Sequence, residues 1–498
     1  MRRWVLAATI LGSAMAFIDT TVVNVALPVI QRDLHASVSD AQWIVDAYLL
    51  VLSSLILAGG SLGDRLGRTR VFSAGILLFA GASIWCGAAG STNQLIAARA
   101  LQGAGAALLV PGSLAIIAAT FPREERGRAI GTWSALTSLA IILGPLLGGV
   151  LVQTISWRAV FLINAPIAAI VLLILWRKVP SDNGERSGAI DWLGTLLVTL
   201  GLGGVVFAFI EAPARGWSSA SVLIAMIGGV LSLIAFLFVE RRAEQPIVPF
   251  ELFRSRAFTG ANLLTLLLYA ALSAATFLLP FNLIQVQGYT PSQAGAAFLP
   301  FVVTMSLLSR WSGALADRIG ARPLLLGGPL IAAAGLALLA WPGVGGSYWT
   351  TFFPGLLVLG IGMALTVAPL TTTVMTSIND ERHAGAASGI NNAVARAAGL
   401  LSIALLGAAA VGLFSRELDS RLADAGAPVE VRRAMAAQSL HLAAAEPPPG
   451  ADEAMVRSAV RHAFVRAFRV TVLAAAVLAA LSCFGALGVQ SRSAVTQN

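Results

Sequence analysis

The chain has 498 residues, of which 57% are hydrophobic and 11% are charged, and its mean hydropathy is +0.82. This composition is too apolar for several soluble domains and predicts an all-α polytopic membrane protein. The net charge of +9 does not indicate a nucleic-acid partner, because the arginines lie in short clusters between apolar runs. Cys86 and Cys483 each lie inside an apolar run, so neither a disulfide framework nor a thiolate metal site is expected.

Apolar runs long enough to cross a membrane recur along the whole chain. A transmembrane helix needs roughly 20 apolar residues. By this criterion we expect fourteen spans, at residues 4–28, 42–62, 71–91, 94–119, 129–152, 159–177, 190–210, 218–239, 257–284, 294–315, 323–342, 350–376, 386–414 and 470–490.

The basic residues predict the orientation of these spans. With the N-terminus inside, the short even-numbered loops and both termini hold about nineteen of the 33 Lys and Arg residues. Both termini are therefore expected in the cytoplasm of a bacterial inner-membrane protein. The loop 415–469 is then extracytoplasmic, although it carries eight arginines; long loops follow the charge rule poorly, and seven acidic residues balance this one.

A glycine-rich and charged stretch at residues 60–70 recurs in weaker form at residues 313–322. Each copy follows the second span of its bundle, so six spans would separate the copies in a plain two-bundle protein, whereas eight do here. The surplus pair predicts an insertion between two bundles. The expected domains are a six-helix bundle at residues 1–178, a linker with two extra spans at 179–256 and a second six-helix bundle at 257–498.

Ionisable residues inside spans are candidates for function, because they are costly to place there. Asp19, Asp46 and Arg99 are expected to share the outer half of the first bundle. Loss of water favours the neutral form of a carboxylate and a nearby guanidinium favours the charged form, so movement of either can load or release a proton. The alternative is a fixed Asp–Arg pair that only balances two charges. Arg310 and Arg396, near cytoplasmic helix ends, are expected to extend toward water.

Two glycine-containing stretches predict close helix contacts. In residues 60–70, glycines permit tight turns and Asp64 can accept hydrogen bonds from a helix N-terminus or from Arg68, which predicts a clasp that holds one state closed. The alternative is a basic anchor with turn glycines. Residues 144–149, Gly-Pro-Leu-Leu-Gly-Gly, combine a helix-disrupting proline with small residues that admit a facing helix.

Several chemistries have no support in the sequence. Lys178 is the only lysine and is preceded by Arg177, so no phosphate-binding loop of the ATPase type is present. No HExxH motif or nucleophile elbow occurs. We therefore expect no enzyme, no metal and no cofactor, and an ion gradient as the energy source.

In the loop before the last span, Val456, Val460, Phe464 and Phe468 recur every fourth residue and predict one amphipathic helix, either a spacer or a membrane-surface element.

Together these motifs resemble the major facilitator superfamily, in particular its fourteen-span drug:proton antiporter branch. Residues 19–28 resemble the signature of that branch, residues 60–70 the loop motif of the superfamily, residues 99–105 its fourth-span motif and residues 144–149 the antiporter motif. Residues 43–48 are similar to second spans of exporters of quaternary ammonium compounds and dyes. Some of those exporters carry acidic residues in later spans, which are absent from spans nine to fourteen here.

The resemblance implies roles for individual residues. Proton coupling or cation recognition is implied for Asp19, with Arg99 assisting proton movement, and the similarity of the second span supports an acidic role for Asp46. The implied conformational switch comprises Gly60, Asp64, Arg65, Gly67, Arg68, Asp317 and Arg318. The antiporter motif comprises Gly144, Pro145, Gly148 and Gly149.

These expectations define one function and its alternatives. We expect a monomeric secondary transporter that exchanges protons for small amphipathic and cationic compounds by alternating access across the lipid bilayer. A dedicated exporter of one endogenous metabolite or antibiotic is an alternative, and a membrane sensor that does not transport is another.

Overall fold

The computed structural model describes residues 2–179, 191–243, 248–377 and 384–489. Within these ranges the side chains at positions 57, 64, 123, 124, 126, 127, 134, 135, 138, 141, 142, 317, 376 and 384–386 are not described. The regular elements of the described ranges are helices. The first are α1 (Arg2–Asp33), α2 (Val38–Leu66), α3 (Arg68–Ala88), α4 (Thr92–Thr120), α5 (Arg123–Thr154), α6 (Ala159–Leu162) and α7 (Asn164–Lys178).

The remaining helices continue the same pattern. They are α8 (Trp192–Arg215), α9 (Ala220–Glu240), η1 (Phe250–Arg254), α10 (Arg256–Phe281), η2 (Asn282–Val286), α11 (Pro291–Ala297), α12 (Leu299–Ile319), α13 (Ala321–Leu339), α14 (Tyr348–Thr376), α15 (Ala384–Asp424), α16 (Val429–Ala437), η4 (Ser439–Ala444), α17 (Glu453–Ser482) and η5 (Cys483–Gly488). Each predicted span coincides with one long helix or with two consecutive helices.

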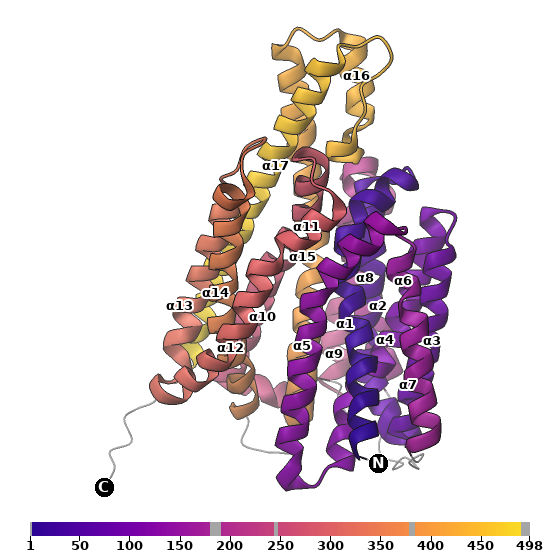
Figure 1. The fold of residues 1–498 in the computed structure, drawn as a ribbon, viewed down its shortest axis with the longest axis vertical. Helices are drawn as coiled ribbons and strands as arrows, with labels where there is room; N and C mark the ends of the chain where they lie inside the picture. The colour runs from indigo at the N-terminus through magenta and orange to yellow at the C-terminus, as the bar shows by residue number, and fades with distance from the viewer. Residues whose placement is uncertain (1, 180–190, 244–247, 378–383, 490–498) are drawn as a thin grey trace.

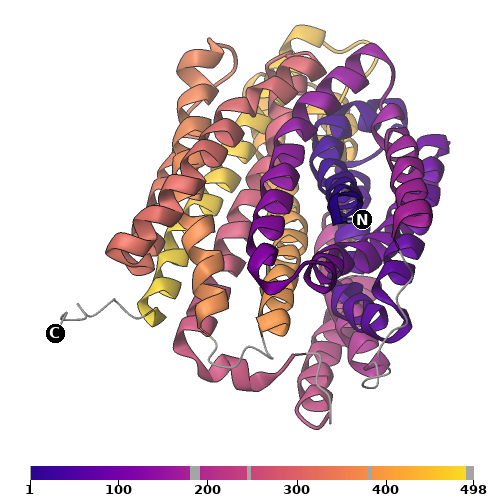
Figure 2. The same cartoon turned by 60° about the horizontal axis from the view of Figure 1, so that its bottom comes forward.

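Two helical bundles stand side by side (Figures 1 and 2). Helices α1–α7 pack mainly on one another, as do α10, α12–α15 and α17, whereas the short helix α11 packs mainly on α5 of the first bundle. Helices α8 and α9 form a separate pair that contacts the first bundle through α2 and the second through α15. This pair is docked by hydrogen bonds from Ser39 Oγ to the Ile210 carbonyl oxygen (3.1 Å) and from Trp43 Nε1 to Glu211 Oε1 (3.1 Å).

Twelve helical segments among the described residues are long and apolar enough to cross a membrane. The predicted count of fourteen also requires α2 and α5, which contain residues outside the described set. These two helices are 29 and 32 residues long, and they pack among the other helices of the first bundle. The count of fourteen therefore stays a prediction.

The repeated charged stretch folds twice into the same turn. Gly67 lies between α2 and α3 with a φ of 101°, and Gly320 lies between α12 and α13 with a φ of 87°. This left-handed region is open to glycine and strained for residues with a Cβ. The glycine that each copy of the motif provides thus joins two consecutive membrane helices without a longer loop.

Residues 415–469 form a helical cap at one end of the bundles, and we name the two ends the cap end and the opposite end (Figure 1). The cap contains the last turns of α15, α16, η4 and the first turns of α17. The predicted amphipathic helix is present, but it is continuous with the last span in the 30-residue α17. Its apolar face is buried in the protein core, so it is not a membrane-surface element; the buried residues are Val456, Val460, Phe464 and Phe468.

The two bundles are joined at the cap end. Gln285 Nε2 of η2 donates to Gln31 Oε1 of α1 (2.9 Å), and Gln31 Nε2 donates to the His441 carbonyl oxygen of the cap (3.3 Å). Gln42 Nε2 of α2 donates to the Ile403 carbonyl oxygen of α15 (2.7 Å). Among the described residues, all hydrogen bonds between the bundles lie in this half, so the interface is closed toward the cap.

Candidate functional site

A buried ion pair joins α1 to α4 inside the first bundle. Arg99 Nη1 lies 2.5 Å from Asp19 Oδ2, and the two side chains are 1% and 0% exposed. The same guanidinium donates from Nε to the Ile44 carbonyl oxygen of α2 (3.0 Å). The ring of Tyr48, one helical turn further along α2, lies under the guanidinium at 4.3 Å from its centroid. The predicted proximity of Asp19 and Arg99 is therefore a direct contact.

Three uncharged side chains complete the hydrogen bonding of this pair. Gln102 Nε2 and Asn164 Nδ2 donate to Asp19 Oδ1 at 2.7 and 3.2 Å. Gln102 Oε1 accepts from Arg99 Nη1 at 2.7 Å. Ser83 Oγ accepts from both amides at 2.8 and 3.2 Å, which connects α3 to α4 and α7. A buried ion pair is tolerated when such additional hydrogen bonds satisfy its remaining polar atoms.

Glycines place Arg99 where it can reach these partners. A Cβ added at Gly103 would lie 2.5 Å from the Tyr48 carbonyl oxygen, and one added at Gly105 would lie 2.6 Å from the Phe79 amide nitrogen. Helix α4 thus touches the backbones of α2 and α3, as small residues allow in membrane bundles. This close approach brings the buried guanidinium onto the Ile44 carbonyl and the face of Tyr48.

The Asp19 carboxylate is held from two other helices. It accepts hydrogen bonds from Gln102 and Arg99 of α4 and from Asn164 of α7, and the bond from the guanidinium is charge-assisted. A movement that separates α1 from α4 would break the bonds to Gln102 and Arg99. A carboxylate whose charge depends on the position of one arginine is suited to proton transfer coupled to movement.

Asp46 lies apart from this network on another face of α2. Gln42, Trp43, Leu49 and Leu50 lie one helical turn from Asp46 on α2. Gln42 and Leu49, on one side of it, contact α15, and Trp43 and Leu50, on the other side, contact α8. Asp46 is 0% exposed, and neither carboxylate oxygen has a hydrogen-bond partner in the described part of the chain. The three predicted residues thus form one pair and one separate acid at the junction of both bundles and the α8–α9 pair.

The glycine-proline stretch in α5 makes two close contacts. A Cβ at Gly148 would lie 2.9 Å from Val22 Cγ2 on α1, and one at Gly149 would overlap the carbonyl oxygen of Pro291, the first residue of α11. Ser292 Oγ donates to the Gly149 carbonyl oxygen (3.2 Å). The expected close helix approach is confirmed, and one of the two partners belongs to the other bundle.

Comparisons with known proteins agree with this architecture. Residues 9–403 match the family model described as Major Facilitator Superfamily. The chain belongs to the major facilitator superfamily. Its relatives include the "Multidrug resistance protein Stp" of Mycobacterium tuberculosis, which is 36% identical over 87% of this chain and 80% of that protein. The "Tetracenomycin C resistance and export protein" of Streptomyces glaucescens is 33% identical over 97% of this chain and 91% of that protein.

A solved structure of the superfamily has the same fold. It is a bacterial homologue of the human lysosomal transporter Spinster, with a TM-score of 0.69 at 19% identity, and the match covers 98% of this chain and 97% of that one. The relatives named for drug resistance confirm the resemblance to the drug-exporter branch. This superfamily member is a membrane transporter and not an enzyme.

The structure describes only part of the predicted conformational switch, which lies in residues 60–70 and 313–322. Arg68 Nη1 of α3 donates to the Ala115 carbonyl oxygen of α4 at 3.5 Å, and Gly60 of α2 lies beside Pro111 of α4. Arg65 is partly buried and Arg318 is exposed. The side chains of Asp64 and Asp317 lie outside the described residues, so the clasp stays a prediction.

Sequence reasoning missed three partners of the ion pair. Gln102 follows Arg99 by one turn, and Ser83 and Asn164 are single polar residues inside apolar spans, which was the available signal. Arg396 lies twelve residues beyond the first residue of α15. Its side chain is partly exposed, and its Nε atom is buried without a hydrogen-bond partner among the described residues, so its extension toward water stays a prediction.

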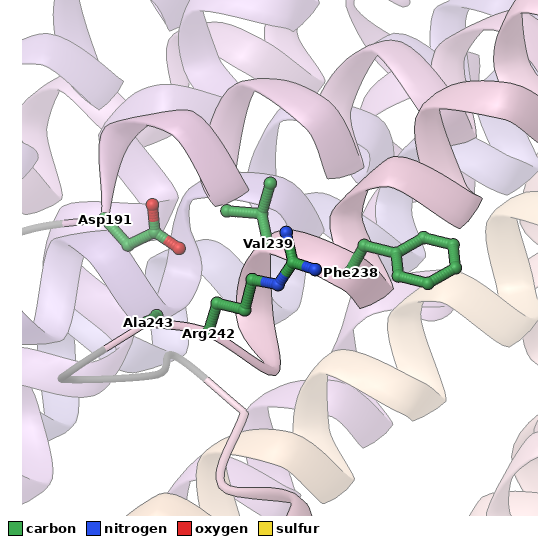
Figure 3. A pocket seen from close by; sticks show the side chains of 5 residues that line it. All are labelled: Asp191, Phe238, Val239, Arg242 and Ala243. Atoms are coloured by element: carbon green, nitrogen blue, oxygen red, sulfur yellow. The ribbon is translucent and has the colours of Figure 1, made fainter.

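A pocket of about 390 Å³ lies away from the ion pair, at the opposite end of the α8–α9 pair (Figure 3). Its lining residues are Asp191, Phe238, Val239, Arg242 and Ala243. Asp191 Oδ1 accepts from the Gly194 amide (2.8 Å), which caps α8. No cluster of His, Cys, Asp and Glu suited to a metal ion occurs among the described residues.

Proposed function

We propose that the chain is a proton-coupled antiporter that exports amphipathic and cationic drugs across the cytoplasmic membrane by alternating access. The proposal includes fourteen spans, arranged as two six-helix bundles at 1–178 and 257–498 and an inserted pair within 179–256, in a monomer. The basic loops orient the opposite end toward the cytoplasm and the cap toward the outside. The relatives named for drug resistance support export as the direction.

The observation that carries proton coupling is the buried Asp19–Arg99 pair with its surrounding hydrogen bonds. In the paired state the guanidinium contacts the Asp19 carboxylate, and the bundle interface of the same state is closed at the cap end. Opening toward the outside moves the helices that hold the network. Separation of the guanidinium then favours protonation of Asp19 by the more acidic exterior, and re-formation of the pair releases the proton on the cytoplasmic side.

The observation that supports a cationic substrate is the position of Asp46. It is an acid at the junction of the two bundles whose oxygens accept no hydrogen bond in the closed state. A buried carboxylate without a partner is more stable in the neutral form. An organic cation that enters between α2 and α15 would stabilise its ionised form, so substrate binding at Asp46 also favours proton release.

Proton release from inverted vesicles tests this proposal. Vesicles containing the full chain are energised, a fluorescent amine reports the pH gradient, and ethidium or a quaternary ammonium salt is added. We expect substrate-dependent proton efflux from the wild type and none from Asp19→Asn, because this substitution removes the titratable group. Asp424→Asn, which makes the same chemical change on the exposed part of the cap, serves as the control and is expected to keep the efflux.

Efflux by Asp19→Asn at the wild-type rate would rule out Asp19 as the coupling residue. Uptake of ethidium without any pH change would contradict antiport while leaving transport intact. In both cases the amount of protein inserted in the vesicles is compared on immunoblots, so that lost insertion is not read as lost coupling.

A dedicated exporter of one antibiotic is the second candidate. Relatives from Bacillus subtilis and Streptomyces coelicolor, 35% and 34% identical, are named "Methylenomycin A resistance protein", and another is named for tetracenomycin C. Names that each refer to one compound favour a narrow range of exported substrates. A panel of dyes and antibiotics in the same vesicle assay separates the two, since a response to one chemical scaffold alone supports this candidate.

A further inference from the structure

Arg396 occupies an unusual place on α15. At 1.5 Å per residue it lies about 18 Å along the helix from Ala384, well inside the apolar part of the second bundle. Gly399 and Ile403 share its helix face, at spacings of three and seven residues. Gly399 lies beside Leu49 of α2, and the Ile403 carbonyl accepts a hydrogen bond from Gln42 of α2. Arg396 therefore lies on the face of the second bundle that meets the first.

Arg396 has no anionic partner among the described residues. It takes part in no ion pair there, and its Nε is buried without a hydrogen-bond acceptor. Asp19 is held by Arg99, and Asp46 accepts no hydrogen bond from any described group. The polar groups near Arg396 are the hydroxyls of Tyr48 on α2 and Tyr269 on α10. An arginine inside a membrane bundle without a counter-charge is costly, which makes it a candidate for ligand binding.

The hydroxyl of Tyr48 provides an independent observation at the same place. It is buried and has no hydrogen-bond partner in the described structure. Thr20 of α1 lies nearby, and its hydroxyl donates to the Ala16 carbonyl oxygen (2.9 Å). Leu49, the residue after Tyr48, lies beside Gly399, which is one turn from Arg396 on α15. The Tyr48 hydroxyl and the Arg396 Nε thus come from adjacent helices of different bundles, and each lacks an acceptor among the described residues. One anionic oxygen between them would accept from both.

Side-chain exposure on this face of α15 falls toward the cap. Asn392 is exposed, Arg396 is partly exposed, and Gly399 and Ile403 are buried. This gradient favours approach to Arg396 from the end away from the cap. In the proposed orientation that end is the cytoplasmic side, from which an exporter collects its substrate.

We propose that Arg396 and the Tyr48 hydroxyl form a subsite for an anionic oxygen group, a carboxylate or ionised phenol, of the exported compound. The assignment rests on the proposed export function for the identity of the occupant. It extends the expected substrates from simple cations to amphoteric compounds whose basic group faces Asp46 and whose acidic group faces Arg396. Tyr48 also stacks on Arg99, so the occupied subsite touches the proton-coupling network through one side chain.

A matched pair of dyes tests the subsite on the purified full-length protein. The pair is a rhodamine with a free carboxylate and the methyl ester of the same dye, and fluorescence polarisation gives both dissociation constants. Because a hydrogen bond to a charged group is lost, we expect Arg396→Gln to shift the affinity ratio against the carboxylate by about tenfold or more. Arg396→Lys should retain part of the preference, and Tyr48→Phe should shift the ratio in the same direction by less.

The outcomes separate this inference from the proposed function. An unchanged ratio in Arg396→Gln, with a folded protein and a working Arg396→Lys, would overturn the subsite. A shift that occurs only when anionic phospholipid is present would also overturn it, because the occupant would then be a lipid phosphate. If Arg396→Gln leaves the affinity ratio of the two dyes unchanged while the protein exports the ester in exchange for protons, the proposed function holds and the subsite does not. If the ratio changes but the protein exports neither dye, the subsite holds and the proposed function does not.

Discussion

Among the described residues, Arg99 in the first bundle and Arg396 in the second both lie inside long membrane helices, but their surroundings differ. Arg99 in the first bundle has a carboxylate, an amide, a backbone carbonyl and an aromatic face as partners. Arg396 in the second bundle has a buried Nε without an acceptor. A satisfied network stabilises one arrangement of helices, whereas an unsatisfied charge leaves part of its interaction free energy available to a ligand. We infer that the first bundle carries the proton chemistry and the second contributes to substrate selection.

Replacing each arginine by methionine tests this contrast most directly. Arg99→Met leaves Asp19 buried without its counter-charge, and breaking such a pair typically costs about 3–5 kcal/mol. Arg396→Met removes a charge that has no counter-ion, so stability should be unchanged or higher. Thermal unfolding of the purified protein in detergent measures both. Equal losses of stability in the two variants would contradict the distinction between the bundles.

A double variant sharpens the same comparison. Asp19→Asn combined with Arg99→Met removes both charges and should recover a large part of the stability that Arg99→Met loses, since no unpaired charge remains. If the double variant is as unstable as the single one, the loss comes from packing at α4 and not from the uncompensated carboxylate.

The amide side chains give the next largest effect. Gln102→Leu removes two donated and two accepted hydrogen bonds, and the bonds to Asp19 and Arg99 are worth about 1.5–3 kcal/mol each because their partners are charged. The matched substitution in the second bundle is Asn391→Leu, which removes bonds to the uncharged Asn262 and Thr265. Its expected loss is about 0.5–1.5 kcal/mol per bond. Thermal unfolding decides the order, and a larger loss in Asn391→Leu would be evidence against a special role of the charged network.

Much of the architecture could be predicted from the sequence, because each span needs a long apolar run and each turn of the charged repeat needs a glycine. The contact of Asp19 with Arg99 was also expected, since two buried ionisable residues in one bundle tend to pair. The partners Ser83 and Asn164 were not, because a single polar residue in a span carries no sign of the direction in which it points. Whether Arg396 faces water, lipid or protein depends on helix packing between bundles, which helix position alone does not indicate.

The cap also makes contacts that the local sequence pattern does not predict. The spacing of Val456 and its successors predicted an amphipathic helix, and this is what forms. The spacing does not indicate that this helix continues into the last span or that Gln31 of the first bundle donates a hydrogen bond to the cap. Such contacts join residues about four hundred positions apart, and local periodicity carries no information on them.

The smallest expected effect concerns Tyr48, which lies under Arg99 and on the helix that packs against the one that carries Arg396. Tyr48→Phe keeps the aromatic face under Arg99 and removes a hydroxyl that has no partner, so the unfolding temperature should stay the same or rise slightly. Tyr48→Leu also removes the ring and should cost about 1–2 kcal/mol through the lost cation–π contact and packing. A marked loss of stability in Tyr48→Phe would mean that the hydroxyl already has a structural partner. In that case the hydroxyl would not be available to an anionic ligand. Tyr48 would then not connect the Asp19–Arg99 network with the proposed subsite at Arg396.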